Sequence, residues 1–116
     1  MSSEDEFQHP VQGRWEAQDP PSAFLEFRGP APAGGVLGGR TGEGTLAGSD
    51  GCNGVGGWYT PDGDTATIRR GLNTLRACPG VDTWLSRTAS VRADGATLHV
   101  YDAAGEEIGV LTRAEP

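Results

Sequence analysis

Two cysteines and two histidines have side chains that could bind a metal ion or carry covalent chemistry. Thiolate sulfurs and imidazole nitrogens are the usual ligands of structural zinc, which takes four of them at characteristic spacings. Cys52, Cys78, His9 and His99 match none of those spacings, and His9 lies in a polar, acidic N-terminal stretch. We therefore expect no metal site.

A catalytic cysteine needs a general base close to its sulfur. His99 is the one histidine beyond the N-terminal stretch, and it alternates with Leu98 and Val100 in ATLHVYD. If these two apolar residues face a core, His99 points to solvent. The sequence therefore predicts that the protein is not an enzyme, and an enzyme that uses Cys52 or Cys78 ranks last among the functions considered.

The stretch GSDGCNGVGGWYT, residues 48–60, is rich in glycine. Glycine-rich loops bind phosphates where a strand hands over to a helix whose N-terminus faces the ligand. Here the glycines lead instead into β-type residues that begin with Trp58 and Tyr59, and the chain contains no lysine. We expect no nucleotide and no other cofactor at this stretch.

A tight structural corner explains the same residues better. Gly51 can adopt a positive φ, which other residues reach only with strain. Asn53 can close the turn by bonding local backbone amides. Cys52, between them, fits as a small buried apolar group.

The elements that must position these residues are limited by size and charge. At 116 residues the chain is long enough for one domain with a single modest core. A net charge of −7 argues against a nucleic-acid or anionic-membrane binder. No apolar run is long enough to span a membrane. The N-terminus lacks the pattern of a secretory signal, which predicts a cytoplasmic protein; a trimmed precursor would instead indicate the cell envelope or secretion.

Turn residues and alternation indicate a β fold. We expect residues 1–11 to form a disordered acidic tail and residues 12–116 to form a single domain. Nineteen glycines and eight prolines predict short strands and tight turns, among them residues 61–64 and 94–95. The fold class is mainly β, a small antiparallel β-barrel or curled sheet of seven to eight strands. The predicted core contains Trp15, Leu25, Phe27, Trp84, Leu85, Leu98 and Val100.

Two further elements follow from periodicity. Val81, Trp84, Leu85 and Thr88 recur at helical spacing, which predicts one short helix over residues 81–88 packed against the sheet. In the last strand, EIGVLT, alternation places Ile108 and Val110 on one face.

Two short motifs in order resemble the META/HslJ domain family. GSDGCNGVGGWYT carries a Gly-Cys-Asn turn after a strand, and NTLRACPG carries a Thr-x-x-x-Cys segment before the helix. Trp15, FLEF and DGATLHVYDAAGEEIGVL are similar to the family in kind and order, so the resemblance covers roughly residues 13–112. It marks Gly51, Cys52, Asn53, Thr74 and Cys78 as motif positions without assigning them chemistry.

The resemblance implies a bacterial protein of the heat-shock or stress-response type with no established catalytic machinery. We expect a monomeric, non-enzymatic stress-associated or protein-interaction module with an unknown protein partner. The alternative is a calycin-like carrier of a small apolar ligand.

In so small a barrel, the corners that carry Cys52 and Cys78 are expected to lie at the same end. The two sulfurs are then neighbours. They form a possible disulfide if they are oxidised, and remain two packed thiols in a reducing cytosol.

Overall fold

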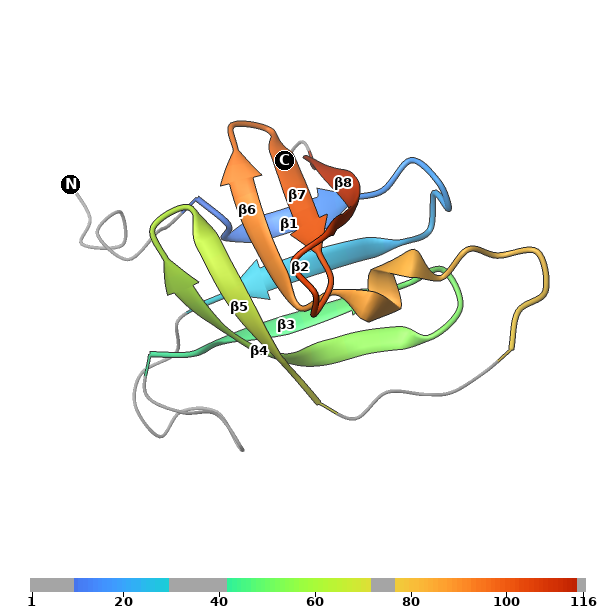
Figure 1. The fold of residues 1–116 in the computed structure, drawn as a ribbon, viewed down its shortest axis with the longest axis horizontal. Helices are drawn as coiled ribbons and strands as arrows, with labels where there is room; N and C mark the ends of the chain where they lie inside the picture. Colours follow the sequence, from blue (N-terminus) through green and yellow to red (C-terminus); the bar gives the residue numbers. More distant parts are fainter. Residues whose placement is uncertain (1–9, 30–41, 72–76, 115–116) are drawn as a thin grey trace.

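Eight antiparallel strands close into a barrel in the computed structural model, which describes residues 10–29, 42–71 and 77–114 (Figure 1). Each strand pairs with the next along the chain, and β1 closes the barrel on β8. The strands are β1 (Gly13–Glu16), β2 (Phe24–Arg28), β3 (Gly44–Ser49), β4 (Gly54–Asp62), β5 (Thr65–Arg70), β6 (Ser90–Asp94), β7 (Thr97–Tyr101) and β8 (Glu107–Arg113). The predicted fold class is confirmed, with closure into a barrel and eight strands.

The predicted core is also confirmed. The strands alternate inward and outward residues, so that Leu98 and Val100 are fully buried on either side of His99. All seven core residues expected from the pattern are buried: Trp15, Leu25, Phe27, Trp84, Leu85, Leu98 and Val100. Tyr59 joins them, and its ring meets Phe27 edge to face at 5.0 Å between centroids. Large side chains therefore fill the barrel interior.

Two hairpins turn where the sequence places glycines. Asp62 pairs with Thr65, so Gly63 and Asp64 form the loop, and Gly63 has a φ of +64°. The next hairpin repeats this arrangement with Gly95 at a φ of +63°. A positive φ at the first loop position suits the twist of the flanking strands, and glycine reaches it without strain.

The predicted helix over residues 81–88 is shorter and of another type. Only a 3-10 helix, η2 (Trp84–Arg87), forms there. The backbone carbonyl oxygen of Leu85 accepts a hydrogen bond from the Thr88 hydroxyl at 2.6 Å and another from the Thr88 backbone amide. These bonds end the helix after one turn. Trp84, Leu85 and Thr88 are still buried, so the apolar spacing indicates which residues are buried there but not the helix type.

In the last strand, Ile108 and Val110 do not share one face as predicted, because Ile108 packs against the core. Leu111 is fully buried, whereas Val110 is 46% exposed. The register of β7 and β8 shifts between Val100 and Tyr101, because Val100 pairs with Gly109 and Tyr101 pairs with Glu107. Ile108 is thus the extra residue of a β-bulge, which reverses the alternation along β8.

The N-terminal segment enters the core earlier than expected. Val11, which the sequence assigned to the tail, is fully buried, and its carbonyl oxygen accepts a hydrogen bond from the Trp15 indole at 2.9 Å. The folded part of the chain therefore includes Val11, while the tail residues 1–9 lie outside the described residues.

Four connections share one end of the barrel because consecutive strands run in opposite directions. They are the β1–β2, β3–β4, β5–β6 and β7–β8 connections, and their described parts are residues 17–23, 50–53, 71 with 77–89, and 102–106. We call this end the loop end. It carries both cysteines and η2, on the right-hand side of Figure 1.

Candidate functional site

The β3–β4 corner is closed by Asp50. Its side-chain Oδ1 accepts hydrogen bonds from the backbone amides of Cys52 at 2.8 Å and Asn53 at 2.6 Å, and its own amide donates to the Asn53 carbonyl oxygen at 3.0 Å. Asp50 is only 2% exposed. The sequence interpretation gave this role to the Asn53 side chain. The signal that could have found it is the Asp-Gly-Cys-Asn order, since aspartate bonds backbone amides two residues on.

Gly51 is the point where three connections meet. Its φ is +96°, and a Cβ placed on it would lie 2.6 Å from Pro20 Cγ and 3.3 Å from Val81 Cγ1. Pro20 belongs to the β1–β2 connection and Val81 to the segment that precedes η2. Glycine is needed here both for its backbone conformation and for this close approach.

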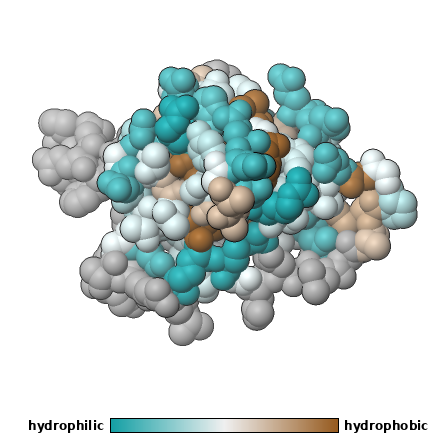
Figure 2. Space-filling model, viewed as in Figure 1, coloured by the Kyte–Doolittle hydropathy of each residue, from teal (hydrophilic) through white to brown (hydrophobic). Residues whose placement is uncertain are grey.

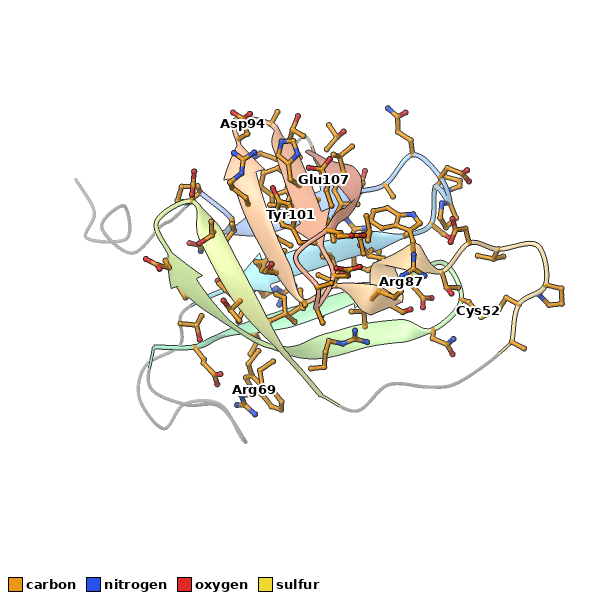
Figure 3. The ribbon with its side chains drawn as sticks, viewed as in Figure 1. Cys52, Arg69, Arg87, Asp94, Tyr101 and Glu107 are labelled. Carbon is orange, nitrogen blue, oxygen red and sulfur yellow. A yellow bond between two sulfur atoms is a disulfide. The ribbon has the colours of Figure 1, made fainter. Side chains whose placement is uncertain are left out.

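A disulfide joins Cys52 to Cys78, with the Cα atoms 6.0 Å apart. It ties the β3–β4 corner to the segment that leads into η2, at the loop end marked by the Cys52 label in Figure 3. In this state neither sulfur is a thiolate, which is the form that attacks substrates and binds metals. The remaining motif position, Thr74, lies outside the described residues.

Trp84 fixes η2 against β8 and the β1–β2 connection. Its indole N–H donates to the Asp19 carbonyl oxygen at 3.1 Å. A Cβ on Gly109 would lie 2.6 Å from two atoms of the indole ring, so the ring packs directly on the backbone of β8. Leu85 beside it is fully buried. The sequence places Trp84 in the core but gives no signal for its contact with Gly109.

Arg70 holds the other side of η2. Its guanidinium donates to the Ser86 carbonyl oxygen, which links the end of β5 to η2. Burial lowers the pKa of Arg70, and the charge of Asp50 partly opposes that shift. Arginine stays charged throughout the physiological range, so the bond persists there.

These contacts enclose one side of a surface pocket of about 430 Å³. Its walls come from three parts of the chain: the β1–β2 connection, η2 together with the segment that precedes it, and β8. The lining residues are Gln18, Asp19, Asp82, Trp84, Arg87, Ile108, Gly109, Val110 and Thr112. Among the described residues, Val110 is the one large hydrophobic side chain that is exposed. The pocket is therefore lined by both apolar and charged side chains.

The charged groups of the pocket do not pair with one another. Asp19, Asp82 and Arg87 are exposed, and none of them forms an ion pair with another side chain in the described part of the protein. Arg87 is labelled to the right of the centre of Figure 3, on η2. The sequence reasoning missed this pocket because its walls are separated by up to about ninety residues.

His99 points outward, as predicted, and its side-chain contacts are with two acidic residues. It is on the outer face of β7, where its Nδ1 is 3.0 Å from a Glu107 carboxyl oxygen and its Nε2 is 4.0 Å from an Asp94 carboxyl oxygen. The strands beside β7 are β6 and β8, whereas both cysteines lie in loop-end connections. The structure therefore does not bring His99 and a sulfur together.

A second charged cluster lies at the other side of the barrel and has no sequence signal. Arg69 donates two hydrogen bonds to the buried Glu43 carboxylate, at 2.8 and 2.7 Å, and its guanidinium carbon lies 4.3 Å from the Trp58 ring centroid. The hydrogen bonds to Glu43 raise the pKa of Arg69, although desolvation opposes them. Burial likewise raises the pKa of Tyr59, whose hydroxyl donates to the Gly29 carbonyl oxygen at 3.1 Å. The Arg69–Glu43 pair links β5 to the start of β3, and the Tyr59 hydroxyl links β4 to the end of β2.

Within residues 10–29, 42–71 and 77–114, no group of three histidine, cysteine or acidic side chains is arranged to hold a metal ion. Over the same residues, no helix is long and apolar enough to cross a membrane. The best-built candidate site in this part of the chain is the loop-end pocket.

Comparison of the chain with protein-family models, with curated proteins and with solved structures found no match. The fold class therefore rests on the structure itself: a closed antiparallel barrel of eight strands.

Proposed function

We propose that this protein is a non-enzymatic protein-interaction module that docks on a partner through the loop-end pocket. The observation that carries the proposal is the position of the pocket: it opens on the outside of a barrel whose interior is filled by Trp15, Phe27, Tyr59 and other buried side chains. A pocket on the outer surface can receive a side chain of another protein.

The composition of the pocket suits a protein partner. Interface centres are typically apolar with a polar rim, and an aromatic or arginine anchor commonly fills a pocket there. Val110 and the half-buried Ile108 supply the apolar part, next to Trp84. The face of the molecule seen in Figure 2 is mostly hydrophilic, with hydrophobic residues only in small groups.

The pocket is also held rigid before a partner arrives. The Trp84–Asp19 hydrogen bond joins η2 to the β1–β2 connection, Trp84 packs on Gly109 of β8, and the disulfide anchors the segment before η2. Walls that need not be ordered on binding lower the entropic cost of association.

The stress association and the META/HslJ membership extend the proposal. They are supported by the two ordered motifs, which include Gly51, Cys52, Asn53 and Cys78. A structural disulfide is typical of an oxidising compartment, which favours the cell envelope or secretion over the cytoplasm.

Site-specific photocrosslinking tests the docking face. A photoreactive p-benzoylphenylalanine at Val110 should give a discrete crosslinked product in the cells that produce this protein, and excess unlabelled protein should abolish it. The matched control is the same group at Thr60, an exposed position on β4, which lies opposite β8 in the strand order. Equal crosslinking at both positions, or none at Val110, would contradict the proposal.

A calycin-like carrier is the second candidate, and the closed eight-strand barrel is the observation that favours it. A barrel of eight strands is either filled by its own side chains or holds one small ligand. Carriage predicts that a fatty acid such as lauric acid protects core amides of β6 and β7 from hydrogen exchange. Protection confined to the outer pocket, or absent, would leave the interaction module.

A further inference from the structure

The loop-end pocket is lined by two aspartates, Asp19 and Asp82, beside the largely buried Trp84. From this chemistry, and resting on the proposed function, we infer that the pocket receives a basic side chain of the partner protein, with arginine as the best fit. Asp19 and Asp82 come from two different connections and line the same hollow. Neither forms an ion pair with another side chain of the described residues.

The protein binds its own arginine in the same way elsewhere. On the other side of the barrel, Arg69 makes a two-point contact with the Glu43 carboxylate and lies 4.3 Å over Trp58. Stacking of a guanidinium on an aromatic ring recurs at Arg14 over Phe24, at 3.9 Å, and at Arg113 over Trp15, at 4.1 Å. The pocket lining combines the same two kinds of residue, aspartates that are exposed and a tryptophan that is largely buried.

Arg87 is the one positively charged residue in the pocket lining, so replacing it tests whether the ligand is positively or negatively charged. Two carboxyl groups against one guanidinium leave an excess of negative charge on the lining. The whole chain carries a net charge of −7, so its long-range field also attracts a basic partner. Arg87 is then available for a carbonyl or carboxylate that neighbours the inserted side chain.

The pocket is large enough to hold one inserted side chain. The pocket volume of about 430 Å³ is near the lower end of the range for small-ligand sites. A whole peptide segment would extend beyond it onto β8, where Val110 is exposed. We therefore expect a small interface in which one partner side chain fills the pocket and the surrounding partner residues contact apolar groups at its edge.

Nuclear magnetic resonance titration of the full chain tests the inference with a defined probe, N-acetyl-arginine N-methylamide. We expect saturable shifts of the Trp84 indole N–H and of the Gly109 and Val110 amides. The matched probe with citrulline has the same shape without the charge and should bind several-fold more weakly. The corresponding glutamate probe should not bind at this site. Raising the salt concentration should weaken the arginine probe, because exposed charges are screened.

Three pocket variants and one control sharpen the test. Asp19→Asn and Asp82→Asn should each weaken the arginine probe about two- to fivefold, as expected for one exposed charge pair. Arg87→Gln should strengthen it by a similar factor, because it removes a repulsive charge. Asp62→Asn, at an exposed carboxyl group in the β4–β5 hairpin, should leave the affinity unchanged.

Equal binding of the citrulline probe, or preferential binding of the glutamate probe that disappears in Arg87→Gln, would overturn the inference. So would shifts confined to another surface, or a loss of affinity in Asp62→Asn as large as in Asp82→Asn. If the arginine probe fails while Val110 still crosslinks to a partner, the docking face stands and only the arginine anchor is wrong. If the probe binds and Val110 does not crosslink, the proposed function is wrong.

Discussion

Asp50 and Gly109 shape the loop end by allowing segments of the chain to approach closely. Asp50 holds the corner that carries Cys52, and Gly109 lets the Trp84 ring lie on β8. Both act by allowing a close approach: one through a small buried acceptor, the other through the absence of a side chain. The shape of the pocket thus depends on residues that are not themselves charged ligand-binding groups.

At Asp50, replacement by alanine removes the acceptor of two backbone hydrogen bonds in a buried corner. We expect Asp50→Ala to lower the free energy of unfolding by about 2 kcal/mol, and Asp50→Asn by less because one side-chain oxygen remains. Urea denaturation monitored by tryptophan fluorescence measures both. Equal stability of Asp50→Ala and the wild-type protein would show that the corner does not depend on this side chain.

At Gly109, a methyl group would overlap the Trp84 ring, since the nearest ring atoms lie 2.6 Å from the position of a Cβ. We expect Gly109→Ala to cost about 1–3 kcal/mol. Trp84→Ala should cost about 3–5 kcal/mol, because the ring is only 8% exposed. In the Trp84→Ala background, Gly109→Ala should be nearly neutral. Additive costs in the double variant would contradict a direct contact.

At the scale of elements, η2 is held by neighbours more than by its own bonds. It contributes a single 3-10 turn, yet the disulfide precedes it, Trp84 anchors it to the Asp19 carbonyl oxygen, and Arg70 binds it from β5. An isolated turn of this length is not stable alone. The order of this element therefore depends on the cross-links around it.

Reduction of the disulfide should loosen this arrangement. The bridge spans a sequence separation of 26 residues, and in the chain-entropy model its loss costs about 3 kcal/mol. For a domain of this size, that lowers the melting temperature by roughly 10–20 °C. We expect this drop with reductant in the wild-type protein, and no effect of reductant on a Cys52→Ala/Cys78→Ala variant that already melts lower. If reductant does not change the melting temperature of the wild-type protein, the disulfide does not stabilise the fold.

At the scale of the whole molecule, the sequence predicts the barrel well because local signals repeat along it. Alternation gives the inward residues Leu98 and Val100, and glycines at 63 and 95 mark the hairpins. Helical spacing fails at residues 81–88 because a 3-10 turn buries the same residues. Alternation fails in β8 because one bulge residue, Ile108, shifts its phase.

The candidate site is much less predictable. The pocket needs Asp19, Trp84 and Val110 side by side, and no local pattern encodes contacts between such distant segments. The Glu43–Arg69 pair is hidden for the same reason. By contrast, the sequence does predict that the two cysteines are neighbours. In an antiparallel barrel the first, third, fifth and seventh connections lie at the same end, and the cysteines belong to the third and the fifth.

Arg113 bridges the first and last strands where the barrel closes. β1 and β8 share only a short ladder, in which Trp15 pairs with Arg113 and Glu16 with Thr112. The Arg113 guanidinium extends that ladder: it donates to the Gln12 carbonyl oxygen at 2.8 Å and the Pro10 carbonyl oxygen at 2.7 Å, and it stacks on Trp15 at 4.1 Å. One side chain thus joins the two ends of the folded chain.

We expect Arg113→Ala to lower the free energy of unfolding by about 2 kcal/mol, since it removes two charge-assisted hydrogen bonds in a partly exposed setting. Arg113→Lys should restore less than half of that, because an ammonium group cannot reach both carbonyl oxygens while stacking on the ring. The matched control, Arg28→Ala, removes an exposed arginine whose ion pair with Glu26 lies on the surface, and should cost less than about 0.5 kcal/mol. Hydrogen exchange locates the effect: the amides of β1 and β8 should exchange faster in Arg113→Ala, while those of β3 and β4 should not. Uniform acceleration across all strands, or full rescue by lysine, would mean that Arg113 does not act as a clasp between the first and last strands.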